Sequence, residues 1–207
     1  AMPLDMVDTC LCMGAGLNIA QGVEKVEPDT TCFAFVGDST FFASAITGVV
    51  NAVYNQANMV LIVLDNSTTA MTGHQPHPGT GQTVMGEIVQ KINIEQVLRG
   101  IGVTEIETIN PLELEASVSC VKRMAEKTGV RAIIFKAPCI AVTKPKAPLH
   151  VDQDSCIGCK KCIRDLGCPA IVMNDGKICI DASMCTGCRL CSQVCPVCAI
   201  AGGDDYE

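Results

Sequence analysis

The sequence predicts an α/β domain, in which helices cover both faces of a parallel sheet, followed by a small α+β domain. Three observations lead to this prediction. Apolar, strand-like runs alternate with segments of helical periodicity as far as about residue 135. A stretch rich in proline and lysine follows, and the cysteines concentrate beyond it. We therefore expect one domain over residues 1–147 and a second over residues 148–207.

The elements of the first domain follow from their periodicity. Residues 31–37 (TCFAFVG) and 59–65 (MVLIVLD) are continuous apolar runs, which is typical of strands buried in a parallel sheet. Between them, apolar residues recur at helical spacing from Phe42 to Val53. The other expected elements are strands at 7–13, 103–109 and 130–135, helices at 17–26, 87–100 and 112–127, and a long loop over 66–83.

Polar residues follow two strands that we expect to be neighbours. The first strand ends at Gly37 and leads directly into Asp38 and a helix, and the next strand leads into Asn66. Adjacent strands lie about 4.8 Å apart, so Asp38 and Asn66 can reach the same ion. Mg²⁺ prefers such oxygen ligands, and a helix start suits a diphosphate. The alternative is an ordinary strand–helix–strand unit, whose turns also use these residue types.

A cysteine pattern occurs twice in the second domain. In each copy, two-residue gaps separate three cysteines, and a fourth cysteine precedes a proline. This spacing is typical of bacterial two-cluster ferredoxins, in which the fourth cysteine ligates the cluster of the other motif. The sequence therefore predicts a bacterial-type ferredoxin domain with two [4Fe–4S] clusters. The predicted ligands are Cys156, Cys159, Cys162 and Cys195 for one cluster, and Cys185, Cys188, Cys191 and Cys168 for the other.

The first motif is wider than the second. Five residues separate Cys162 from Cys168, whereas three separate Cys191 from Cys195. The wider loop leaves open whether the first motif supports a complete cluster. Structural zinc sites are the alternative, although they usually take four ligands from two separated pairs. Two cysteines of this domain, Cys179 and Cys198, lie outside the ligand pattern, and Cys198 is expected to pack or to act as a substitute ligand.

Composition excludes several functional classes. The formal net charge of −7, with no basic stripe, argues against nucleic acid or an anionic membrane surface as a partner. The apolar runs are too short to span a bilayer, and no secretory signal pattern opens the sequence. Ten of the 15 cysteines lie between Cys156 and Cys198, and eight of these fit the cluster spacing. This usage favours a reducing, cytoplasmic location.

Both candidate sites resemble those of one family. Gly37-Asp38 followed by Asp65-Asn66 resembles a thiamine diphosphate fingerprint, with Ser39 in place of the usual second glycine. The stretches GDSTFF, NAVYN, LIVLDN and TTAMTGHQPHPGTG resemble the alpha subunit of indolepyruvate:ferredoxin oxidoreductase. That subunit also ends in a two-cluster module with a widened first motif, but it is much longer. Its aminopyrimidine-binding domain has no counterpart in this sequence.

The resemblance assigns roles to individual residues. It implies Asp38, Asn66 and the backbone carbonyl of Thr68 as Mg²⁺ ligands. It places three residues, His74, Gln75 and His77, in a loop over the reacting carbon as catalytic candidates. The other residues that it places at the cofactor are Cys12, Met13, Gly14, Gly37, Ser39, Thr40, Thr69, Met71 and Thr72.

The resemblance also implies an activity. A thiamine-dependent enzyme of this family decarboxylates a 2-oxoacid oxidatively, here an arylpyruvate such as indolepyruvate, and forms acyl-CoA from coenzyme A. Two iron–sulfur clusters pass the electrons to ferredoxin. The implied assembly is a hetero-oligomer with an aminopyrimidine-binding domain or subunit and a beta- or gamma-type partner. The alternatives are an electron-transfer subunit of another oxidoreductase and a non-oxidative decarboxylase, which has no use for clusters.

Overall fold

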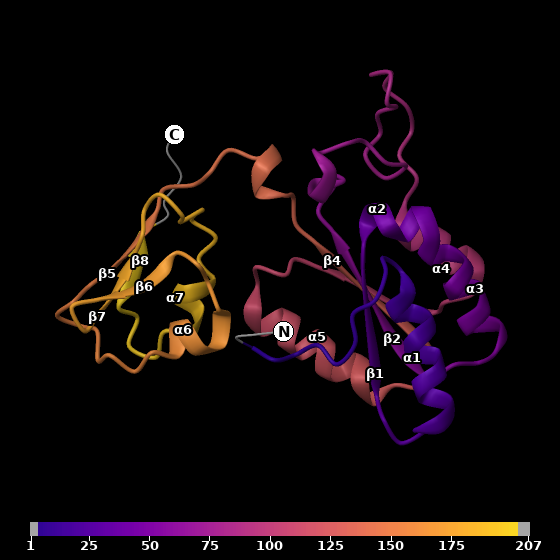
Figure 1. Ribbon diagram of the computed structural model, residues 1–207, viewed down its shortest axis with the longest axis horizontal. Helices are drawn as coiled ribbons and strands as arrows, with labels where there is room; N and C mark the ends of the chain where they lie inside the picture. The colour runs from indigo at the N-terminus through magenta and orange to yellow at the C-terminus, as the bar shows by residue number, and fades with distance from the viewer. Residues whose placement is uncertain (1–3, 203–207) are drawn as a thin grey trace. The chain divides into compact units, whose positions relative to one another are not determined.

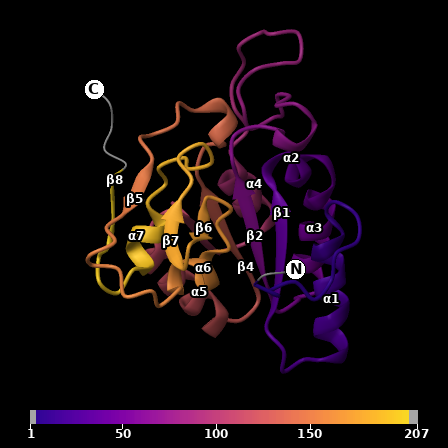
Figure 2. The same cartoon turned by 60° about the vertical axis from the view of Figure 1, so that its left-hand side comes forward.

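The computed structural model describes residues 4–202 (Figures 1 and 2). The chain splits into two compact units, one spanning Thr9–Val142 and the other combining Ala1–Asp8 with Thr143–Glu207. The break therefore falls inside the stretch rich in proline and lysine, slightly before the expected boundary at residue 148. The ends of the two expected domains, residues 1–3 and 203–207, lie outside the described residues.

A four-stranded parallel sheet forms the centre of the larger unit. Its strands are β1 (Cys32–Gly37), β2 (Met59–Asp65), β3 (Glu105–Ile109) and β4 (Val130–Lys136), in the order β1-β2-β4-β3. The predicted parallel sheet is thus confirmed, and β1 and β2 are hydrogen-bonded neighbours. Gly37 pairs with Leu64 at the carboxyl ends of these two strands, so the residues that follow emerge side by side.

Helices cover both faces of the sheet, as the sequence predicts (Figure 1). One face carries α1 (Ala15–Val26), α3 (Ile46–Tyr54) and α4 (Ile94–Ile101), and Leu17, Val49 and Leu98 are buried there. The opposite face carries α5 (Leu114–Glu126), with Cys120 and Met124 buried against β2 and β4. Successive residues of β2 serve the two cores in turn because side chains alternate across a strand.

The helix that follows β1 has an irregular first section. It begins as α2 (Asp38–Thr40), continues through a π-helical turn, η1 (Phe41–Ala45), and then becomes α3. Phe41 is fully buried in this turn and packs edge-on against Phe42 at 5.3 Å between ring centroids. Single π-helical turns occur frequently at functional sites. The irregular section therefore coincides with the residues that follow the carboxyl end of β1.

The expected strand over residues 7–13 is wrong. Val7, Leu11 and Met13 are exposed, and the Ala15 amide bonds to the Cys12 carbonyl in a turn that leads into α1. Gly14 ends this turn with a φ of 86°, and a Cβ there would lie 2.4 Å from Ser44 Oγ. The apolar pattern of residues 7–13 does not form a strand because the chain uses this stretch to approach η1 closely.

The expected helix over residues 87–100 begins too early. The helix α4 starts at Ile94, where the Asn93 side chain caps it by accepting a hydrogen bond from the Gln96 amide at 3.0 Å. Residues 81–89 instead form a hairpin-like projection from the unit. The capping asparagine, rather than the upstream apolar pattern, sets the start of the helix.

The smaller unit contains two short antiparallel ribbons. One pairs β5 (Leu149–Val151) with β8 (Ile200–Gly202), and the other pairs β6 (Ile171–Asn174) with β7 (Lys177–Ile180). Two short helices, α6 (Lys161–Leu166) and α7 (Leu190–Val194), follow the cysteine loops. No helix among the described residues of either unit has the length and apolar character to cross a membrane.

The sequence repeat of the smaller unit is also a repeat of backbone geometry. Lys160 and Arg189 precede the two helices, and their φ angles are 61° and 66°. Gly158 and Gly187 also have positive φ, at 66° and 70°. In each copy, the first cysteine amide bonds to the carbonyl of an aspartate four residues earlier at 3.0 Å. The two loops therefore present their cysteines from the same backbone conformation.

Candidate functional site

The carboxyl ends of β1 and β2 meet at a buried aspartate. Asp38 is 2% exposed, and its Oδ1 accepts a hydrogen bond from the Ser39 amide at 2.8 Å. Its Oδ2 accepts one from the Ser67 amide, also at 2.8 Å, across the gap between the strands. A second link joins the Thr69 hydroxyl, as donor, to Ser39 Oγ at 2.9 Å. The loops after the two strands thus form one polar site.

A histidine from a distant loop completes the surroundings of Asp38. His77 Nε2 lies 3.1 Å from Asp38 Oδ2, and His77 Nδ1 accepts a hydrogen bond from the Gly79 amide at 3.1 Å. Because Nδ1 is an acceptor, the neutral ring carries its proton on Nε2 and donates it to Asp38. The ring is buried beside Phe42, with 5.8 Å between centroids.

The Asp38 carboxylate lacks a full counter-charge among the described residues. Burial raises its pKa above the usual range, and the nearby Asp65 carboxylate adds to this effect. The amides of Ser39 and Ser67 and the His77 ring act in the opposite direction, but burial dominates. Asp65 itself pairs with Lys136 at 3.3 Å. A buried carboxylate that neutral donors stabilise only in part is suited to binding a cation.

Asn66 and Thr68 lie in the turn after β2. Asn66 Oδ1 accepts a hydrogen bond from the Thr68 amide at 3.1 Å, and the Thr68 carbonyl accepts one from the Ala70 amide at 3.1 Å. Each of these two oxygens retains a second lone pair for a cation. Within residues 4–202, no three His, Cys, Asp or Glu side chains form a group that could hold a metal ion. A magnesium site here would therefore combine Asp38 with neutral oxygens.

The three residues expected to line the catalytic loop divide between two environments. His74 and Gln75 are exposed, and a bridge between Thr69 and Gln75 holds their loop together. Thr72 donates to Gln75 Oε1 at 2.7 Å in the same loop, whereas His77 turns inward to Asp38. The sequence did not reveal the contact between His77 and Asp38. These residues are 39 positions apart, and no spacing rule connects them.

The remaining predicted cofactor residues lie along the edges of this site. The close approach of Gly14 to Ser44 and Thr40 brings the turn containing Cys12 and Met13 next to the first turns of the helix. Cys12 and Met13 are exposed there. Met71 is 87% exposed in the short helix η2 (Ala70–Thr72). Polar side chains, the Gly14 backbone and exposed apolar side chains thus lie around the carboxyl ends of β1 and β2.

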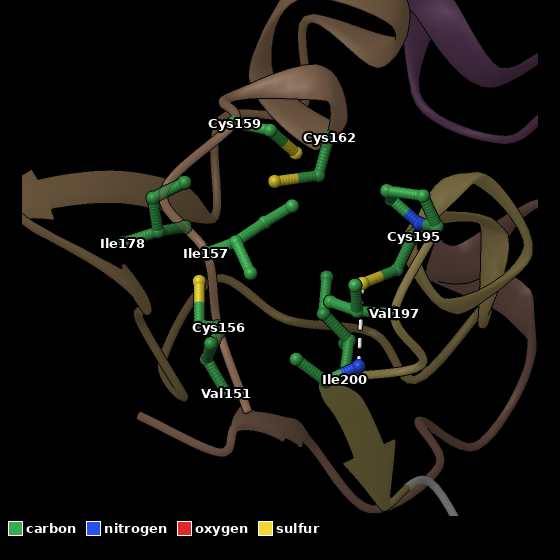
Figure 3. Close-up of a pocket in the computed structure, with 11 residues that line it drawn as sticks. Val151, Cys156, Ile157, Cys159, Cys162, Ile178, Cys195, Val197 and Ile200 are labelled. Carbon is green, nitrogen blue, oxygen red and sulfur yellow. Dashed lines mark hydrogen bonds between the residues drawn. The ribbon is translucent and has the colours of Figure 1, made fainter. Parts of the chain in front are cut away.

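A small cavity in the smaller unit is lined by cysteines from both motifs (Figure 3). Cys156, Cys159 and Cys162 come from the first motif and Cys195 from the second. Apolar side chains complete the lining, including Ile157, Ile178 and Ile200. The Ala199 amide donates a hydrogen bond to Cys195 Sγ at 3.3 Å, so this sulfur has a backbone donor. The lining is sulfur-rich and otherwise apolar.

The other four predicted ligands are near enough to influence one another's ionisation. The pKa of the Cys191 thiol is raised to about 11, first by burial and then by the neighbouring Cys188, Cys185 and Cys168. In the first group, burial raises the pKa of Cys162, and Cys159 and Cys195 add to the effect. Thiols that hinder one another's ionisation in this way are suited to a cationic centre, which stabilises several thiolates at once. The predicted ligands thus fall into two sets, each with a cysteine from the other motif, although neither set, as the structure places it, forms a group of three side chains that could hold a metal ion.

Comparison with known proteins identifies the larger unit. Residues 2–135 match the family described as "Thiamine pyrophosphate enzyme, C-terminal TPP binding domain". The fold is also similar to that of a 2-oxoglutarate:ferredoxin oxidoreductase from Magnetococcus marinus, with a TM-score of 0.56 and 19% identity. That similarity covers 63% of this chain and 47% of the other. The parallel sheet and its helices are thus those of a thiamine diphosphate-binding fold.

Curated relatives extend the similarity to nearly the whole chain. The indolepyruvate oxidoreductase subunit IorA of Methanothermobacter thermautotrophicus is 41% identical over 200 residues, and that of Archaeoglobus fulgidus is 39% identical over 204. Each alignment covers 96% of this chain. The chain spans about a third of the length of these relatives (32% and 33%). The resemblance seen in the sequence is confirmed.

Proposed function

Because this chain belongs to the thiamine pyrophosphate enzyme family through its C-terminal TPP-binding domain, we propose that it is the cofactor-binding and electron-transferring part of a 2-oxoacid:ferredoxin oxidoreductase. The reaction is the oxidative decarboxylation of an arylpyruvate such as indolepyruvate to acyl-CoA and CO2. Support for the substrate comes from the relatives, which are named indolepyruvate oxidoreductase subunits.

The observation that carries this proposal is the buried carboxylate of Asp38 between the ends of two neighbouring strands. Its Oδ2 already accepts from the Ser67 amide and faces His77, whereas its Oδ1 accepts only from the Ser39 amide. A carboxylate oxygen has two lone pairs, so Oδ1 is the atom left for Mg²⁺. Asn66 and the Thr68 carbonyl would be the neutral ligands, and the diphosphate of thiamine together with water would supply the remaining ones.

Thiamine diphosphate, when bound, supplies the nucleophile that allows a 2-oxoacid to lose CO2. The chain's own residues would hold its diphosphate and metal. Ser39, Thr40 and Thr72 would bind the diphosphate, and the turn from Cys12 to Gly14 would contact the cofactor's side. His74 and Gln75 remain candidates for contacting the substrate. We assign His77 to orienting Asp38, since its ring is buried against that carboxylate.

The cysteine groups would hold two [4Fe–4S] clusters that transfer electrons one at a time. Cys156, Cys159, Cys162 and Cys195 line one cavity, which supports a shared cluster with an exchanged fourth ligand. Cys185, Cys188, Cys191 and Cys168 would hold the second cluster. The final acceptor is ferredoxin. The location would be the cytoplasm, where reducing conditions keep cysteine thiols from forming disulfides.

A partner must complete this enzyme. The mechanism needs a carboxylate that activates the aminopyrimidine of thiamine, and we find no motif for it in these 207 residues. We therefore propose a hetero-oligomer with an aminopyrimidine-binding domain or subunit and a beta- or gamma-type subunit. The chain alone should take up electrons from dithionite but release no CO2 from indolepyruvate. Substantial turnover by the isolated chain would place the activating group within it.

The test of the cofactor site is the variant Asp38→Ala in the assembled enzyme. Removal of the carboxylate should weaken thiamine diphosphate binding in the presence of Mg²⁺ by about 100-fold or more, measured by calorimetry, while iron content stays constant. Asp65→Asn is the matched control, since Asp65 is the neighbouring carboxylate but bonds to Lys136 and Ser67 rather than to the metal. Unchanged thiamine binding by Asp38→Ala would refute the site. An electron-transfer subunit with a merely structural sheet would bind no thiamine in either form.

A further inference from the structure

Residues 81–89 form a projecting hairpin, which we call the arm. The Val89 amide bonds to the Gly81 carbonyl at 3.0 Å, and the Thr83 amide bonds to the Glu87 carbonyl at 2.9 Å. The Gly86 amide closes the turn by bonding to the Thr83 carbonyl at 3.0 Å. The arm therefore has a defined conformation that its own backbone bonds maintain. It extends from the larger unit in Figures 1 and 2 (magenta).

The tip of the arm is apolar and exposed. Val84 is 82% exposed, Met85 87% and Ile88 84%, although all three belong to residue types that are usually buried. None of residues 82–93 is buried in the structure. Within residues 81–89, Glu87 is the single charged residue. A cluster of apolar side chains at the end of a projection is typical of a surface that contacts another protein, rather than of a solvated loop.

The base of the arm is fixed to the candidate cofactor site. The Ile92 amide bonds to the Pro78 carbonyl at 2.9 Å, and the Thr80 hydroxyl donates to the His77 carbonyl at 2.8 Å. His77 in turn contacts Asp38. In Figures 1 and 2, the arm lies at the same end of the sheet as α2, where β1 and β2 end. A protein bound to the arm would therefore lie beside the cofactor site.

We propose that the arm is the docking element for the domain or subunit that supplies the aminopyrimidine half of the thiamine site; this inference rests on the proposed function. Three observations favour this occupant. The arm is continuous with the loop that carries His77, so its partner would lie next to the cofactor. About two thirds of the length of the relatives has no counterpart in this chain. The nearly uncharged tip matches an apolar groove rather than a charged surface.

Site-specific crosslinking tests the identity of the partner. Met85 is replaced by the photoreactive amino acid p-benzoylphenylalanine in the assembled enzyme, and the adduct is mapped by mass spectrometry after irradiation. We expect the adduct on sequence outside these 207 residues, in the polypeptide that binds the aminopyrimidine. An adduct within residues 1–207 of a second copy, or no adduct in an assembly shown to be intact, would overturn the proposal.

A polar variant of the tip tests its contribution to binding. The triple substitution Val84→Ser, Met85→Ser and Ile88→Ser should weaken association with the partner at least about tenfold, because a cluster of apolar anchors dominates such interfaces. The matched control replaces Val26 and Tyr54 with serine, which are 77% and 84% exposed at the ends of α1 and α3. Association is measured by sedimentation velocity, and circular dichroism verifies that both variants fold. Normal association of the folded tip variant would refute the arm's role.

The two proposals can fail separately. If the assembled wild-type enzyme binds no thiamine diphosphate but Met85 still crosslinks outside this chain, the proposed function is wrong and the arm remains an interface. If the enzyme binds thiamine diphosphate normally and the tip variant assembles like the wild type, the arm proposal is wrong and the proposed function stands. A loss of both assembly and thiamine in the tip variant alone supports both proposals.

Discussion

The two units of the chain differ in what fills their interiors. The large side chains that are fully buried all come from residues 9–142, among the residues that the structure describes; examples are Phe41, Met59 and Leu61. In the smaller unit, apolar burial is carried by a few side chains such as Leu149 and Ile178, and predicted cluster ligands lie among its buried residues. The larger interior is mainly packed hydrocarbon, although it includes the fully buried charged side chain of Arg131, whereas the smaller interior buries few large side chains and includes Cys162 and Cys191.

This difference indicates two sources of stability. The larger unit has an apolar core on both faces of its sheet, so we expect it to fold without a ligand. The smaller unit falls in the size range in which apolar burial alone is marginal, so bonds from thiolates to iron would contribute directly to its folding free energy. Loss of the iron–sulfur clusters should therefore leave the larger unit folded and disrupt the smaller one.

Removal of iron should separate the two units most clearly. We expect anaerobic treatment with a chelator and reductant to abolish the protection of amide hydrogens in residues 149–202, because the thiolates lose their shared cation. The amides of β2 and β4 should remain protected, since their core contains no predicted ligand. Hydrogen exchange with mass spectrometry measures both regions in one sample. Undiminished protection of the smaller unit after complete iron removal would contradict this account of its stability.

Substitution of the fourth ligand, which comes from the other motif, should damage one cluster selectively. Cys195→Ser should alter the paramagnetic spectrum of the cluster assigned to Cys156, Cys159 and Cys162, because Cys195 lines the same cavity. The other cluster should retain its spectrum. Cys198→Ser is the control, since Cys198 is exposed three residues away and lies outside the cavity lining. If Cys195→Ser instead changed the cluster of Cys185, Cys188 and Cys191, the crossed assignment would be wrong.

A core substitution should affect only the larger unit. Phe41 is fully buried and packs against Phe42, so Phe41→Ala should lower the free energy of unfolding of this unit by about 3–5 kcal/mol. Urea denaturation followed by far-ultraviolet circular dichroism provides the measurement, and the absorbance of the clusters should be unaffected before unfolding. Simultaneous loss of cluster absorbance and helical signal would show that the two units unfold as one.

The elements with strong periodicity were predictable from sequence. The runs that form β1, β2 and β4 are mostly apolar, with Arg131 as the exception inside β4, because both faces of the sheet are covered, and such runs have few alternative structures. The positions of Asp38 and Asn66 followed from the ends of those strands. Local spacing also anticipated that Cys156, Cys159 and Cys162 would line one cavity, since they lie within seven residues, whereas the two ligand sets remain predictions.

Features that depend on contacts between distant residues were not predictable. Residues 7–13 have a strand-like composition, but the approach of Gly14 to Ser44 gives them a turn. Residues 87–92 continue the pattern of a helix, but Asn93 caps the helix downstream. The burial of His77 against Asp38 arises because the loop after β2 returns to β1, and neither residue carries a local signal for it.

The smallest predicted effect tests that unforeseen contact. His77 donates from Nε2 to Asp38 Oδ2, which leaves Oδ1 oriented toward the proposed metal. His77→Leu removes the donor, and it should weaken Mg²⁺-dependent binding of thiamine diphosphate by about 10–100-fold, as expected for a residue that orients a metal ligand. His77→Gln places an amide donor near the Nε2 position and should recover most of the affinity. Calorimetry on the assembled enzyme distinguishes these variants. A loss caused only by poor packing beside Phe42 would be equal in both variants, and that result would exclude the orienting role.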